Sequence, residues 1–135
     1  MEERIATLVD ELKLNEGAPL ELIDEVEVQL HASFPVDYRK FMAESNGGEG
    51  GVGTRSYLVL WPLEDLIPLN EAYAVKEFAP GLILFGSDGG DTAYAFDARE
   101  TALIIIEVPF IGMSVNEARP CGASFLDFLK YLHEQ

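Results

Sequence analysis

The segment from Phe34 to Gly50 constrains the fold most, because it combines a proline start, an apolar stripe and a glycine-rich end. Pro35 suits the first turn of a helix, where its missing N–H is not needed. Asn46 and Gly47 both tolerate positive φ, which is typical of a left-handed helix C-cap. The segment therefore predicts one short helix that ends at a turn toward a sheet. Its buried face is expected to hold Tyr38, Phe41 and Met42.

Helical periodicity also occurs at both ends of the chain. Apolar residues at i, i+3, i+4 and i+7 predict a first amphipathic helix over Met1–Leu14. A second is expected over Leu20–His31, with Leu20, Ile23, Val26 and Leu30 buried. Near the C-terminus, Ser124 is expected to cap a last helix, with Asp127 three positions on. The buried stripe of that helix would be Phe125, Phe128, Leu129 and Leu132.

The middle of the chain is typical of strands. Thr54–Trp61 alternates, with both faces apolar, and predicts a central strand. One or two short helices broken at Pro68 are expected to follow over Leu63–Phe78. Further strands are expected over Leu82–Phe85, Thr92–Phe96 and Leu103–Val108, the first two joined by a hairpin turn over Gly86–Asp91. Residues 1–135 are thus expected to form one α+β domain, with an antiparallel or mixed sheet of about four to six strands packed by N-terminal helices and a C-terminal helix.

Charge restricts the possible partners. The 24 acidic and 9 basic residues give a formal net charge of -15. Nucleic-acid binding is disfavoured because no Lys or Arg cluster is present to hold phosphates. The single cysteine, Cys121, excludes an internal disulfide and indicates a reducing compartment. The Met1–Arg4 start does not resemble a signal peptide, and no apolar run is long enough to span a membrane. We therefore expect a soluble, cytoplasmic protein with an acidic surface.

Motifs for catalysis or cofactor binding are missing from the sequence. Gly48–Gly53 matches G-x-G-x-x-G, but it follows a helix and precedes a strand, the reverse of the dinucleotide fingerprint, so we interpret it as a helix-to-strand turn. Asp88, Asp91 and Asp97 lack the spacing of a calcium loop and are better explained by a polar hairpin. Cys121 precedes the last helix, whose dipole could lower its pKa. The only histidines, His31 and His133, leave little material for a catalytic pair. We expect a non-enzyme without cofactor or metal.

Several short blocks, in this order along nearly the whole chain, resemble the SMI1/KNR4 family of the SUKH superfamily. They are Pro35–Phe41, Ser45–Gly48, Trp61–Leu66, Leu84–Gly86 with Gly89–Gly90, Phe96–Asp97, and Ser124–Leu129. The resemblance implies an α+β domain. In bacteria such domains are immunity proteins that bind and neutralise a cognate toxin, often a nuclease, of polymorphic or contact-dependent toxin systems. Fungal members carry long extra segments that this chain lacks, so the compact bacterial type fits better. The family offers no catalytic residues to carry over.

An immunity role would give the negative charge a purpose, because an acidic inhibitor is attracted to the basic groove of a nuclease toxin. The expected partner is therefore a basic protein, with no nucleic acid or membrane. Regulatory or scaffold binding of an endogenous protein is an alternative. Another is a small-ligand site in a cleft between Gly47–Gly53 and Asp88–Asp91. Tyr57 and Trp61 could anchor a partner, although we favour core packing for both. The candidate acidic contacts are Asp24, Glu25, Glu44, Glu49, Asp88 and Asp91.

Overall fold

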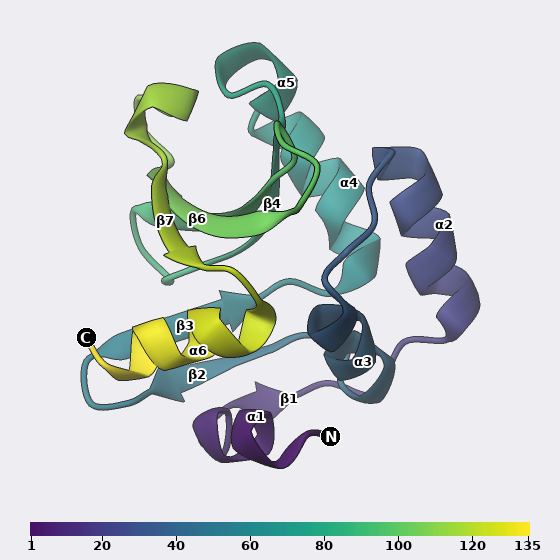
Figure 1. Cartoon of the computed structure of the whole chain (residues 1–135), viewed down its shortest axis with the longest axis vertical. Coiled ribbons are helices and arrows are strands. Elements are labelled where there is room, and N and C mark those ends of the chain that lie inside the picture. Colours follow the sequence, from purple (N-terminus) through teal and green to yellow (C-terminus); the bar gives the residue numbers. More distant parts are fainter.

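The computed structural model describes residues 1–135 as one α+β domain built on a seven-stranded antiparallel sheet. The sheet is therefore larger than the expected four to six strands. Its strands lie in the order of the sequence, each paired with the next, and Figure 1 shows that the sheet is strongly curved. The strands are β1 (Lys13–Leu14), β2 (Gly48–Val52), β3 (Ser56–Leu60), β4 (Leu82–Ser87), β5 (Thr92–Asp97), β6 (Ile104–Pro109) and β7 (Arg119–Gly122).

The helices occupy two places around this sheet. The C-terminal helix α6 (Phe125–His133) lies against β2, β3 and β7, inside the curve of the sheet, while α4 (Leu63–Ala72) packs between α2 (Leu20–Leu30) and β4 (Figure 1). Figure 1 shows α1 (Glu3–Leu8) at the opposite end of the molecule from α5 (Val75–Phe78). The other helices are α3 (Val36–Glu44) and the 3-10 helix η1 (Val115–Glu117).

The centre of the core is an aromatic cluster between α3, α6 and the sheet. The stripe expected on α6 is confirmed, since all four of its residues are buried. Ser124 accepts a hydrogen bond from the Asp127 N–H at 3.0 Å, as the expected cap requires. Tyr38 lies at the middle of the cluster with no exposed surface. Its ring makes edge contacts with Phe34, Phe85, Phe96 and Phe125.

The Tyr38 hydroxyl has no hydrogen-bond partner, and burial raises the pKa of this phenol far above its usual range. An unpaired buried hydroxyl carries a desolvation cost. Replacing Tyr38 with phenylalanine keeps the ring contacts and should raise the free energy of unfolding by about 1 kcal/mol. Urea denaturation of both proteins measures this difference. A less stable variant would show that the hydroxyl is satisfied in solution.

The N-terminal helix is shorter than predicted. It ends at Leu8, and the chain then turns and forms strand β1, which pairs with β2 through Lys13 and Leu14. The second helix also differs from expectation at its start: Ile23 and Val26 are buried, but Leu20 is 60% exposed. Both errors arise at the ends of helices. There the apolar spacing in the sequence extends beyond the residues that are helical and buried in the structure.

Pro68 does not break a helix. It lies inside α4, and the interruption comes later, at Ala74, which has a left-handed backbone with φ of 53°. Asn70 secures α4 to the sheet from the turn after the proline. Its side chain accepts a hydrogen bond from the Leu84 N–H at 2.8 Å and donates to the Leu84 carbonyl at 2.9 Å. Asn70 thereby takes the place of a neighbouring strand where β3 has already ended.

The predicted left-handed C-cap at Asn46 is wrong. α3 ends at Glu44, its C-cap Ser45 has extended backbone, and positive φ begins only at Gly47, with 85°. Asn46 instead turns its buried side chain toward the start of α4. Its Oδ1 accepts from the Leu63 N–H at 2.9 Å, and its Nδ2 donates to Glu64 at 2.7 Å. Asn46 therefore caps α4 from outside, where Pro62 supplies no side-chain cap.

The glycines at 48–52 form a strand and not the expected turn. β2 pairs with β1 on one side and with β3 on the other. The chain before β1 passes close to it: a Cβ at Gly50 would lie 2.5 Å from the Glu11 carbonyl oxygen and 2.8 Å from the Leu12 Cα. Glycine is needed at this position because two backbones approach each other closely. A phosphate-binding loop uses glycine for the same purpose, so the two structures look alike in sequence.

A second cap links the two ends of the aromatic core. The Asp37 carboxylate accepts from the N–H groups of Phe125 at 3.2 Å and Leu126 at 2.9 Å. These are the first two residues of α6, so Asp37 satisfies free donors at that helix terminus and lies near the positive end of its dipole. α3 and α6 are thereby fixed relative to each other across 88 residues of sequence.

Candidate functional site: an acidic and aromatic surface

The face of β2 and β3 that points away from α6 is accessible to solvent. Leu58 and Leu60 are buried on the inner face, whereas Tyr57, on the opposite face, is 43% exposed. Glu49 lies on the same outer face, because it pairs with Val59 in the register. The Tyr57 hydroxyl donates a 2.6 Å hydrogen bond to the Glu49 carboxylate, which raises the pKa of Tyr57. Tyr57 was expected to pack in the core, and this expectation is wrong.

The β4–β5 turn lies beside Tyr57. A Cβ on Gly89 would come within 3.1 Å of the Tyr57 ring, so the turn backbone lies directly on that side chain. The Asp88 carboxylate stabilises the turn by accepting from the N–H groups of Gly90 at 2.8 Å and Thr92 at 3.2 Å. Asp91 is exposed, and its carbonyl oxygen accepts from the Phe110 N–H at 2.9 Å. The predicted hairpin is confirmed, and it brings two acidic residues to this face.

Three aromatic rings continue the surface beyond Asp91. Phe110 contacts Tyr73 with ring centroids 4.7 Å apart, and Tyr73 stacks on Trp61 at 6.3 Å and 10°. Trp61 itself is buried, as its expected core packing requires, while Tyr73 is 41% exposed. Ile111, next to Phe110, is 86% exposed. A run of partly exposed apolar side chains beside acids is typical of protein-binding surfaces.

We call this surface the acidic–aromatic strip. It brings together four of the seven residues that the sequence suggested for partner binding, namely Glu49, Trp61, Asp88 and Asp91. It also contains two residues that sequence reasoning missed, Tyr73 and Phe110, because only the folded chain places the end of α4 beside the end of β6. The strip is defined by Glu49, Tyr57, Trp61, Tyr73, Asp88, Asp91 and Phe110.

The other three candidates lie on α2 and α3, outside the strip. Asp24 pairs with Arg39 at 3.1 Å, in a group where Arg39 also pairs with Glu27. Glu25 accepts a hydrogen bond from Gln29, and Glu44 lies 2.7 Å from the amino group of Met1. The contacts of Asp24, Glu25 and Glu44 are exposed, so each contributes little to stability.

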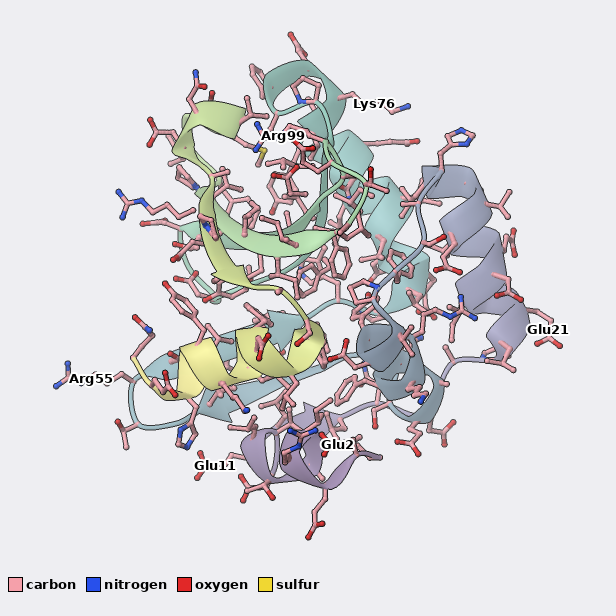
Figure 2. All side chains as sticks on the ribbon, in the orientation of Figure 1. Glu2, Glu11, Glu21, Arg55, Lys76 and Arg99 are labelled. Carbon is pink, nitrogen blue, oxygen red and sulfur yellow. The ribbon has the colours of Figure 1, made fainter.

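Basic side chains are few and separated. Figure 2 shows Arg55 extending from the β2–β3 turn and Lys76 from α5, at different ends of the molecule, and Glu11 and Glu21 on two further sides. Arg39 and Arg99 are engaged by acids of their own, Asp24 and Glu27 in one case and Asp97 in the other. The surface thus presents negative charge in most directions, with no continuous basic region for phosphate.

Asp97 lies apart from Asp88 and Asp91, and Cys121 is buried. Asp97 is buried at the far end of β5 from Asp91, where hydrogen bonds from Arg99 lower the pKa of its carboxyl. No group of three acidic, histidine or cysteine side chains is placed to hold a metal ion. Burial raises the pKa of the Cys121 thiol to about 12, against the lowering suggested by its position before α6.

The cleft suggested for a small ligand is occupied by β3, which runs between β2 and β4. Two cavities lie elsewhere. One, of about 890 Å³, opens between α3 and the β5–β6 turn, and the other, of about 670 Å³, lies between α2, α4, α5 and the start of β4. Neither is lined by Gly47–Gly53 or by Asp88–Asp91. None of the helices has the length and apolarity that crossing a membrane would require.

Comparison with known families gives one match. The model of the SMI1 / KNR4 family (SUKH-1) matches residues 17–131, nearly the whole chain. The matched region begins after α1 and β1 and includes every residue of the strip. No curated protein matches the sequence significantly.

Proposed function

The chain belongs to the SMI1/KNR4 family (SUKH-1), and from this premise we propose that it is a non-enzymatic immunity protein that binds and neutralises a toxin. Bacterial domains of this family are associated with polymorphic and contact-dependent toxin systems. The observation that carries the proposal is the acidic–aromatic strip within the family region, because it combines negative charge with exposed rings.

The strip has the two properties that such an inhibitor requires. A formal net charge of -15 attracts a basic toxin over long range and speeds its approach. Retention of the toxin depends on a few desolvated anchors, which are most often aromatic residues or arginine. Tyr57 and Tyr73 are the exposed rings available for this, and Glu49 and Asp91 lie beside them. We infer that a nuclease toxin would be blocked at its nucleic-acid groove.

Protection of cells tests the proposal directly. The domain is co-expressed with the toxin domain encoded by the neighbouring gene, and growth is measured. We expect the wild-type chain to restore growth, and the double variant Tyr57→Ala with Tyr73→Ala to restore it poorly, because two anchors are lost. Glu25→Gln on α2 is the control, expected to protect as wild type does. Growth arrest despite a folded, abundant wild-type chain would contradict the immunity role.

Association with the toxin should depend on salt. Between 50 and 500 mM NaCl we expect the association rate constant to fall by about tenfold or more, because screening shortens the reach of the surface charge. The dissociation rate should change far less, since it depends on close contacts. Stopped-flow fluorescence measures both rates. An association rate that is constant over this range would show that charge does not steer the encounter.

A further inference from the structure

One oxygen of Glu49 is free for a partner. The Oε2 atom accepts the hydrogen bond from Tyr57 at 2.6 Å, and this bond restricts where the exposed carboxylate can lie. The Oε1 atom accepts no hydrogen bond from within the chain. Lys13 stands opposite Glu49 in the β1–β2 register but forms no ion pair with it. Glu49 therefore presents to solvent a positioned oxygen that accepts no hydrogen bond from the chain.

The Tyr57 ring beside this oxygen is also held in place. Its hydroxyl is bonded to Glu49, and the Gly89 backbone lies on the Cδ2 and Cε2 edge of the ring. Gly89 has a φ of 81°, and a Cβ there would come within 3.1 Å of the ring, so the contact requires glycine. Because 43% of Tyr57 is still exposed, the strip offers an ordered aromatic surface next to a carboxylate oxygen.

We propose that Tyr57 and Glu49 form a seat for an arginine side chain of the protein partner. A guanidinium is planar, so it stacks on the Tyr57 ring and at the same time donates to Glu49 Oε1. A lysine ammonium is a point charge that pairs with the carboxylate without stacking. Asp88 and Asp91, on the same turn as Gly89, add negative charge on the β4 side of Tyr57, while Glu49 lies on its β2 side. This assignment rests on the proposed function only in requiring a basic protein partner.

Blocked hexa-arginine and hexa-lysine peptides test the seat without a toxin. Titration calorimetry at 150 mM salt should show hexa-arginine binding about two- to fivefold more tightly than hexa-lysine, the range expected for one exposed stacking contact. Tyr57→Thr, which suits an exposed strand position, should abolish this preference and leave hexa-lysine binding nearly unchanged. Tyr57→Phe keeps the ring and should retain most of the preference. Glu25→Gln is the charge control for Glu49→Gln: it removes the same charge far from the seat. It should retain the full preference for hexa-arginine.

Equal affinities for the two peptides, absence of binding by both, or a preference that survives in Tyr57→Thr would overturn the seat. Thermal melts confirm that each variant is folded; if Tyr57→Thr is not, Glu49→Gln replaces it and should weaken arginine binding more than lysine binding. Failure here leaves the cell-protection result intact, because that assay measures toxin neutralisation by the whole surface. Conversely, a chain that fails to protect cells but prefers arginine retains the seat and loses the immunity role.

Discussion

Replacing Asn46 with alanine should lower the free energy of unfolding by about 3 kcal/mol, the largest loss we expect from any polar side chain of this protein. The Asn46 side chain is buried and satisfies the Leu63 N–H at the start of α4. Without it this buried donor has no partner, and the hydrogen bond to Glu64 is lost as well. Chemical denaturation followed by circular dichroism measures the change.

Asn116→Ala is the matched control for this variant. Asn116 is exposed in η1, and only its backbone N–H takes part in a hydrogen bond, so its loss should change stability by less than about 0.5 kcal/mol. Hydrogen exchange adds a local readout, because the amide of Leu63 should lose protection in Asn46→Ala before distant strands do. Equal stability of the two variants would mean that α4 is capped in another way.

Gly50→Ala is the second large effect, expected to cost about 2 to 3 kcal/mol through overpacking. The added Cβ would lie 2.5 Å from the Glu11 carbonyl oxygen and close to the Leu12 Cα, both backbone atoms that move only with the chain. We expect β1 to separate from β2, which would expose Met1–Glu16 to proteases. Denaturation gives the cost, and limited proteolysis shows which segment is released.

Gly51→Ala, one residue further along the same strand, controls for the propensity change. Its Cβ would meet the end of the Glu11 side chain at 3.4 Å, which can move aside, and the Ser56 carbonyl oxygen at 3.8 Å, which is ordinary van der Waals contact. Alanine there should be within about 0.5 kcal/mol of the wild type. If both alanines cost the same, the loss reflects strand flexibility and not contact with the N-terminal segment.

Two kinds of element could be predicted from the sequence. The helix α6 has one buried stripe and a serine cap, and the β4–β5 hairpin has two apolar runs, buried along nearly their whole length, joined by turn residues. β1, β2 and β7 were missed because their residues carry no strand pattern. β2 contains three glycines and β7 contains Pro120. These segments become strands through pairing with neighbouring strands, so pairing in the folded sheet outweighs their low propensity.

The candidate site was predictable only in its chemistry. Negative charge and exposed turn acids were evident, but the strip joins β2, β3, α4, the β4–β5 turn and the end of β6, a neighbourhood that exists only after folding.

The short sequence blocks that resemble the family have a structural explanation. Asn46 links its block to Leu63, and Asp37 links its block to Phe125, so these residues maintain helix caps and not a binding site. The residues that carry the family resemblance therefore indicated the fold, and they gave little information about the acidic–aromatic strip.

The edge strands of the sheet, β1 and β7, limit the ways in which a partner protein can bind. β1 has only two residues and β7 carries a proline, so neither border offers a long row of free backbone groups for strand addition. Under the proposed function, side chains are therefore expected to recognise the partner, in place of strand addition at these borders. An exposed position such as Tyr57 can be substituted without touching the helix caps made by Asn46 and Asp37, so recognition and scaffold can be varied separately.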